Sequence, residues 1–152
     1  MNIWRPSPSI VVKSLGLHWR SQSLLAVEVL NDAGDIKGVR PLGGTVEFGE
    51  TWREALLREF KEELEIEVTL SGKPLIMENI YSHEGVDGHE IVFISEVLFP
   101  AGVYESMDKV IFAEASGQIC TARWFSLADL DNGGVELYPT GLKNRLLTSD
   151  HG

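Results

Sequence analysis

The sequence has little cysteine and little positive charge: one cysteine, Cys120, and 13 Lys and Arg against 23 Asp and Glu. A single cysteine excludes an internal disulfide framework and a cysteine-rich zinc site, and it is typical of a reducing, cytoplasmic environment. The net charge of −10 argues against nonspecific binding to nucleic acid backbones, which requires a basic surface. The richest apolar stretch, 91–104, is interrupted by Glu96 and Pro100, so no run reaches the roughly 18 residues of a membrane-spanning helix.

The length of 152 residues suits a single domain. With 43% hydrophobic and 24% charged residues, the composition is that of a folded chain rather than a disordered one. We see no repeat, low-complexity block or internal linker. Only the two ends, 1–9 and 149–152, are expected to be loose, since two prolines fall in the first of them.

Strand-like and helix-like segments alternate along the interior. Apolar and β-branched residues between turn signals predict strands over 10–19, 24–30, 36–40, 75–83, 89–99 and 118–125. An Asp-Gly step at 87–88 predicts the hairpin turn that joins the fourth and fifth of these. Short helices are expected over 126–130, with Ser126 as N-cap, and over 142–147, with a start as early as Pro139.

The segment 51–64 predicts a long amphipathic helix after the glycine-rich stretch 43–49. Thr51 and Glu54 form a capping box at its start. At about 100° per residue, one face is apolar and is expected to be buried, comprising Trp52, Leu56, Leu57, Phe60 and Leu64. Along the edge of that face lie three carboxylates at positions i, i+3 and i+4: Glu59, Glu62 and Glu63. Their Cβ atoms are therefore neighbours on the helix surface.

The three carboxylates have two interpretations. They could form a solvated acidic face, because like charges at this spacing cost only a few tenths of a kcal/mol. They could also bind a hard divalent cation such as Mg²⁺, which prefers oxygen ligands. A rigid helix would hold such ligands in fixed register, and glycines nearby would let the backbone approach the same place.

The surrounding residues resemble the Nudix box, G-x5-E-x7-R-E-U-x-E-E-x-G-U, in which U is apolar. Eight of its nine specified positions match: Gly44, Glu50, Arg58, Glu59, Phe60, Glu62, Glu63 and Ile66. The ninth, the glycine after the helix, is Glu65 in this chain. A glycine there would act as a left-handed C-cap, so the departure concerns the loop after the helix and removes no metal ligand.

The resemblance implies the Nudix fold, an α/β/α sandwich with a central mixed β-sheet between the 51–64 helix and the C-terminal helix. It implies hydrolysis of a pyrophosphate linkage in a nucleoside diphosphate derivative, by water attack at phosphorus, with Mg²⁺ or Mn²⁺ as cofactor. The implied metal ligands are Glu59, Glu62, Glu63 and the Gly44 carbonyl. Arg58 is expected to orient a neighbouring carboxylate in the catalytic machinery. Glu50 is expected to be structural and to brace the loop against the helix N-terminus, where negative charge is favourable.

The general base is left open among three glutamates. Glu59 lies in the box, Glu114 on a loop before the last predicted strand, and Glu90 at the start of a strand. For the substrate, Arg40 is a candidate phosphate contact. A base-stacking aromatic is expected, for which Tyr81 is the first candidate, followed by Trp4, Trp19 and Tyr104.

Two further residue types have simpler interpretations. His83 and His89 flank the predicted hairpin turn and could bind metal together, although surface histidines are the commoner case. Cys120 is expected to be a buried, small apolar residue.

Three classes of function follow from these residues. The first is a metal-dependent pyrophosphohydrolase acting on a small, soluble nucleotide-type substrate rather than on long nucleic acid or a membrane. The second is a non-catalytic Nudix-fold module that senses a nucleotide or metabolite, and the third is an acidic structural or Ca²⁺-buffering protein. The intact arginine and carboxylates favour the first, and the absence of a spaced Asp loop of the EF-hand type ranks the third last. A homodimer is left open as the assembly.

Overall fold

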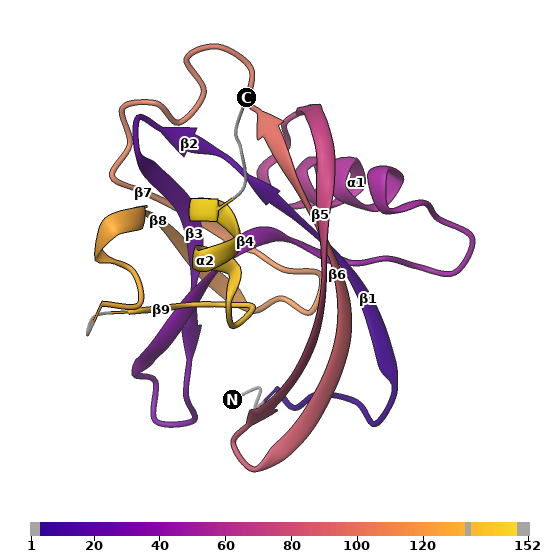
Figure 1. The fold of residues 1–152 in the computed structure, drawn as a ribbon. Helices are drawn as coiled ribbons and strands as arrows, with labels where there is room; N and C mark the ends of the chain where they lie inside the picture. Colours follow the sequence, from indigo (N-terminus) through magenta and orange to yellow (C-terminus); the bar gives the residue numbers. More distant parts are fainter. Residues whose placement is uncertain (1–3, 133–134, 149–152) are drawn as a thin grey trace.

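The computed structural model describes residues 4–132 and 135–148 (Figure 1). Its centre is a mixed sheet in the order β5-β6-β1-β4-β3-β8-β7, with β2 paired to β3 and β9 paired to β4. The strands are β1 (Ile10–Leu17), β2 (Trp19–Arg20), β3 (Ser23–Leu30), β4 (Ile36–Thr45), β5 (Thr69–His83), β6 (Val86–Leu98), β7 (Lys109–Ala113), β8 (Ile119–Ser126) and β9 (Glu136–Leu137). The helices are α1 (Trp52–Leu64), α2 (Leu142–Thr148) and a 3₁₀ turn, Leu127–Asp129.

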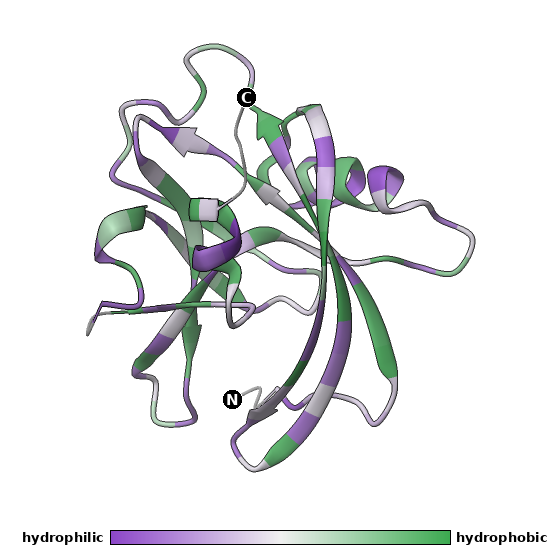
Figure 2. Cartoon of the chain, viewed as in Figure 1, coloured by the Kyte–Doolittle hydropathy of each residue, from purple (hydrophilic) through white to green (hydrophobic). Residues whose placement is uncertain are grey.

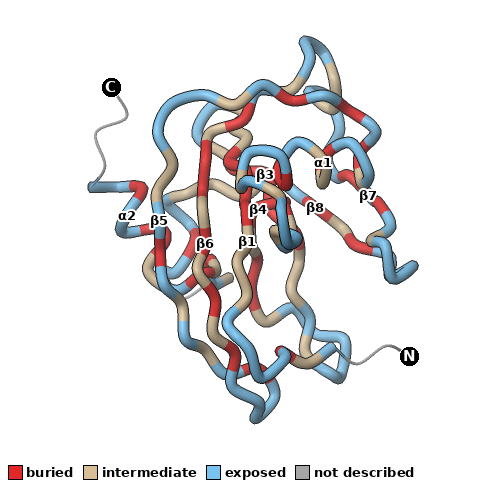
Figure 3. The backbone as a smooth tube through the Cα atoms, turned by 90° about the vertical axis from the view of Figure 1, so that its right-hand side faces the viewer, coloured by how far each residue is buried: buried red, intermediate tan, exposed pale blue. Residues whose placement is uncertain are grey.

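Two hydrophobic cores lie on opposite faces of this sheet, because successive side chains of a strand point to opposite faces. In β3, Leu25 and Val27 belong to the core that includes α1, and Leu24 and Ala26 belong to the core that includes α2. The buried residues follow the central strands, and the hairpin ends are exposed (Figure 3). The predicted α/β/α sandwich is therefore confirmed.

Helix α1 starts and packs largely as its sequence predicts. Thr51 accepts a hydrogen bond from the Glu54 amide, and the Glu54 side chain accepts one from the Thr51 amide, completing the capping box. The helix carries both hydrophobic and hydrophilic residues, as an amphipathic helix should (Figure 2). The prediction that Leu57 belongs to the buried face is wrong, since this residue is 41% exposed. Ala55, which was not predicted to be buried, is fully buried.

Several element boundaries differ from the expectation. Strand β4 continues to Thr45, so Gly43 and Gly44 lie in a strand rather than in the loop. The β5–β6 turn falls at Glu84–Gly85 and not at Asp-Gly 87–88, because both residues have the positive φ that tight hairpin turns require. Strands β7 and β9 were not expected, and α2 begins at Leu142 rather than Pro139.

Residues 4–6 contact the rest of the chain, unlike the loose end expected for 1–9. Arg5 forms an ion pair with Asp32, Pro6 is buried, and the Trp4 ring lies 5.3 Å from that of His83. Residues 1–3 and 149–152 lie outside the described part of the chain. Among the helices that the structure describes, none is long and apolar enough to cross a membrane.

Glu65 ends α1 in the left-handed conformation (φ 57°, ψ 35°), and its amide donates to the Lys61 carbonyl. We expect Glu65→Gly to raise the free energy of unfolding by about 1 kcal/mol, because a side chain in this region costs roughly 1–2 kcal/mol. The measurement is the midpoint of urea unfolding. Glu67→Gly, an exposed neighbour without a positive φ, is the control and should not stabilise. A lower midpoint for Glu65→Gly would show that the cap carries no strain.

Candidate active site

Arg58 joins the end of β4, the following loop and helix α1. Its Nε and Nη2 donate to the Glu50 carboxylate at 2.7 and 2.9 Å, and Nη2 also donates to the Thr45 carbonyl at 3.0 Å. Its Nη1 donates to Glu59 at 3.0 Å and to Glu62 at 3.4 Å. Hydrogen bonds from Arg58 are the main cause that lowers the pKa of Glu50 to about 2. One guanidinium therefore fixes the loop and two helix carboxylates in a single arrangement.

Glu59 packs directly against the backbone of β4. A Cβ atom on Gly44 would lie 2.4 Å from the Glu59 carboxyl carbon, so only glycine leaves room for this carboxylate. The same strand register places Gly44 opposite Ser14, whose buried hydroxyl donates to the Trp52 carbonyl at 2.7 Å. Burial raises the pKa of Glu59, partly offset by Arg58. The Gly44 backbone and the Glu59 carboxylate thus lie side by side.

Glu63, one turn further along α1, is a partly buried carboxylate that makes no hydrogen bond or ion pair within the described residues. Burial, followed by the negative charge of Glu59, raises the pKa of Glu63 to about 8. Glu62 is more exposed, with 53% of its side chain accessible, and lies 3.4 Å from Nη1 of Arg58. The helix therefore presents one unpaired carboxylate, Glu63, beside two that Arg58 contacts.

Two strands bring further groups to these carboxylates. Arg40 of β4 lies 3.6 Å from Glu114, which follows β7. The Cys120 thiol donates to Glu114 at 3.1 Å, and burial together with this bond raises the pKa of Cys120 to about 12. Arg40 and Glu114 are close enough to Glu63 to change its pKa in opposite directions. Cys120 is buried as expected, but its bond to Glu114 had no signal in the sequence.

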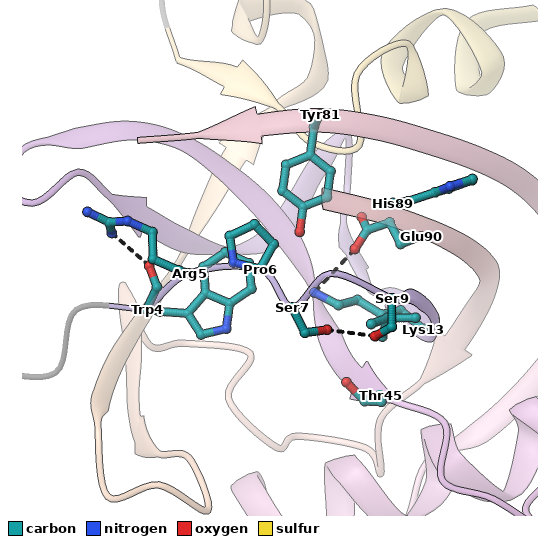
Figure 4. A pocket seen from close by; sticks show the side chains of 11 residues that line it. Trp4, Arg5, Pro6, Ser7, Ser9, Lys13, Thr45, Tyr81, His89 and Glu90 are labelled. Atoms are coloured by element: carbon teal, nitrogen blue, oxygen red, sulfur yellow. Dashed lines mark hydrogen bonds and ion pairs between the residues drawn. The ribbon is translucent and has the colours of Figure 1, made fainter. Parts of the chain in front are cut away.

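Glu90 and Tyr81 lie in a separate pocket, beside Lys13 of β1 (Figure 4). Glu90 is buried, with 8% of its surface exposed, and is bound by Lys13 at 3.3 Å and by the Asn79 amide at 3.1 Å. Thr45 also lines this pocket. The structure therefore separates Glu90 from the carboxylates of α1. Nothing in the sequence pattern had singled out Lys13.

The other aromatic and histidine candidates differ in their surroundings. Trp4 lines the same pocket as Tyr81, whereas the Trp19 indole donates to Glu96 and the Tyr104 hydroxyl donates to the Leu64 carbonyl. His89 lies 3.2 Å from Glu78. His83 is only 8% exposed and its Nδ1 lies 3.1 Å from the Lys37 ammonium, so its interpretation as a surface residue is wrong.

A family model of the NUDIX domain matches residues 20–143. The chain belongs to the Nudix family. The match includes the whole of α1 and extends past Glu114, so it covers the Arg58 cluster together with Arg40 and Glu114. The resemblance read from the box, and the assignment to a family of hydrolases, are confirmed.

Solved structures share the fold of this Nudix protein. The E. coli ORF135 protein is 20% identical, with a TM-score of 0.61 over 91% of this chain and 89% of that chain. A MutT NUDIX hydrolase from Burkholderia pseudomallei is 18% identical, with a TM-score of 0.54 over 92% and 99% of the two chains. A UDP-X diphosphatase is 15% identical, with a TM-score of 0.57 over 94% and 63%. A comparison with curated protein sequences finds no match.

The carboxylates of the Nudix helix fit a hard divalent cation. Within residues 4–132 and 135–148, no three His, Cys, Asp or Glu side chains form a ready-made metal cage. Mg²⁺ does not need one, since it commonly keeps several waters and takes the rest of its ligands from one or two carboxylates and substrate phosphates. No described residue forms a hydrogen bond or ion pair with Glu63, and a cation between Glu63 and Glu59 would relieve the repulsion between these two carboxylates.

The raised pKa of Glu63 predicts how the metal-free protein responds to pH. The ordinary pKa of a glutamate is 4.5, and that of Glu63 in the folded protein is about 8. At pH values between these two, the folded state keeps a proton that the unfolded state has released, so the free energy of unfolding falls as the pH rises. We expect Glu63→Gln to remove this loss. In EDTA, the melting temperature of Glu63→Gln should be close to that of wild type at pH 5 and above that of wild type at pH 8. Parallel pH profiles of the two proteins would contradict the burial of Glu63.

Proposed function

We propose that this Nudix protein hydrolyses a pyrophosphate linkage in a small nucleoside diphosphate derivative, with Mg²⁺ or Mn²⁺ as cofactor. The observation that carries the proposal is the unpaired Glu63 beside Glu59, which Arg58 holds against Gly44. The groups that would hold the cation are the carboxylates of Glu59, Glu62 and Glu63 and the Gly44 carbonyl. A bound cation supplies positive charge that offsets the charge on the phosphate oxygens.

Glu114 is the group that we assign as general base. It lies near the α1 carboxylates but on a different element, so it can accept a proton from the attacking water without giving up a place in the ligand set. Arg40, 3.6 Å from Glu114, provides positive charge for a phosphate oxygen on the same side. Arg58 acts as a positioning residue, because its five N–H groups are occupied by oxygens of β4, the loop and α1.

The charge distribution supports a small substrate. Long nucleic acid would meet the acidic surface of a chain with net charge −10, whereas a small pyrophosphate needs only the cation-loaded site. The name of one structural relative, a UDP-X diphosphatase, agrees with a nucleoside diphosphate derivative. The full set of helix carboxylates favours hydrolysis over a sensing module, which would not need them. The single cysteine agrees with action in the cytoplasm.

A metal-supplemented screen tests the proposal. Nucleoside triphosphates, dinucleoside polyphosphates, nucleotide sugars, ADP-ribose and NADH are incubated with protein and Mg²⁺ or Mn²⁺, and products are separated by anion-exchange chromatography. We expect turnover of at least one class, with loss of activity in EDTA and recovery when metal is added back. Absence of turnover across the panel, or turnover that EDTA leaves intact, would reject the proposal.

A further inference from the structure

A pocket of about 240 Å³ lies between the N-terminal segment 4–9 and strands β1, β4, β5 and β6 (Figure 4). Trp4 and Tyr81 bring aromatic rings to it, and the Tyr81 hydroxyl and the Glu90 carboxylate point into it. The Tyr81 hydroxyl makes no hydrogen bond with any described residue. The pocket therefore combines flat apolar surface with polar atoms that a ligand can reach.

Both aromatic walls are positioned by neighbouring residues of the described chain. Gly88 lies opposite Tyr81 in the β5–β6 pairing, and a Cβ there would come within 2.4 Å of the Tyr81 ring, so the glycine gives the ring its room. The Trp4 side chain is 51% exposed, and its neighbour Arg5 is anchored to Asp32. Asp32 is in turn tied to the β5–β6 turn, since its amide donates to the Glu84 carboxylate.

The polar side of the pocket offers a donor next to an acceptor. The Lys13 ammonium lies 3.3 Å from the Glu90 carboxylate, and Asn79 binds the other carboxylate oxygen. A carboxylate has about four acceptor positions, so Glu90 can still accept from a ligand. The edges of nucleobases place an N–H donor beside a carbonyl or ring-nitrogen acceptor, which matches this pair.

The pocket borders the site proposed for hydrolysis at the end of β4. Thr45 lines the pocket, and its carbonyl accepts a hydrogen bond from Arg58. The preceding residue, Gly44, touches Glu59. A ligand whose flat end fills the pocket would therefore extend across the end of β4 toward the carboxylates of α1.

We propose that this pocket binds the base of the nucleoside diphosphate derivative, with the base against Trp4 and Tyr81 and an N–H group of the base donating to Glu90. The inference rests on the proposed function for the identity of the substrate. It adds the N-terminal segment to the substrate site and makes Glu90 a specificity residue rather than the general base.

Binding to the metal-free protein tests the pocket without any turnover. The probes are AMP, GMP, CMP and UMP, with ribose 5-phosphate as the base-free reference, measured by isothermal titration calorimetry in EDTA. We expect the best-bound nucleotide to bind at least about 10-fold more tightly than ribose 5-phosphate, given the strength of base–aromatic stacking. Trp4→Ala should abolish this ratio, and Trp4→Phe should retain it.

Glu90→Gln should change the order of affinity among the four nucleotides, while Glu105→Gln, an exposed control, should not. If Glu90→Gln fails to fold, the Trp4 pair still decides, because Trp4 is half exposed and its loss leaves the core intact. Equal affinity for nucleotides and ribose 5-phosphate, or a ratio that Trp4→Ala preserves, would overturn the proposal. So would tighter, Trp4-dependent binding of glucose 1-phosphate, which would assign the pocket to a sugar. Trp4-dependent nucleotide binding without turnover in the screen would reject only the hydrolysis.

Discussion

Glu63→Gln is expected to lower kcat/KM by at least about 100-fold, because a neutral amide is a poor ligand for Mg²⁺. Loss of groups that merely support metal ligands already costs about 10–100-fold, and we propose that Glu63 binds the cation directly. The fold should survive, since Glu63 forms no hydrogen bond or ion pair with the described residues that its loss would break. Steady-state kinetics with Mg²⁺, together with circular dichroism, measure both effects.

The matched control for this change is Glu67→Gln. Glu67 lies just beyond α1, with 87% of its side chain exposed, so the same chemical change there should leave kcat/KM near the wild-type value. Raising the Mg²⁺ concentration should recover part of the activity of Glu63→Gln if metal affinity is what was lost. Wild-type activity in Glu63→Gln at limiting Mg²⁺ would refute the metal assignment.

Glu114→Gln is expected to lower kcat by about 10²–10⁴-fold, the usual contribution of general acid–base catalysis. KM and the affinity for Mg²⁺ should change little, because Glu114 lies on the β7–β8 connection and not on α1. The loss should be smaller at high pH, where hydroxide can replace the base. The pH–rate profile and metal titration of the variant measure these effects.

Glu59→Gln separates the two remaining candidates for the base. If Glu114→Gln keeps full activity while Glu59→Gln is inactive, the base lies in the helix and Glu114 is only a partner of Arg40 and Cys120. Glu105→Gln, an exposed glutamate on the loop before β7, is the control for a charge change in this part of the chain. Its kcat should equal that of wild type.

The sequence alone determined helix α1 and the side chains on it. The capping box, the apolar face and the spacing of Glu59, Glu62 and Glu63 depend on residues three or four positions apart, so local geometry suffices to place them. The departure at Glu65 was also visible, and the structure keeps the left-handed cap that the glycine would have formed. Most strands were also visible from local runs of apolar and β-branched residues, although their ends were not, and β7 and β9 were missed.

Only the tertiary structure decided which distant groups meet this helix. Glu114 and Arg40 lie on different strands, and the pairing of β4 with β1 and of β7 with β8 determines where each is placed. Trp4 joins Tyr81 and Glu90 because the N-terminal segment packs against distant parts of the chain, through the Arg5–Asp32 ion pair across 27 residues and the contact of Trp4 with His83. Such contacts depend on long-range register and side-chain burial, which local periodicity does not encode. The carboxylates of α1 can therefore be placed from nearby residues in the sequence, whereas the general base and the substrate pocket that we propose depend on how the sheet assembles.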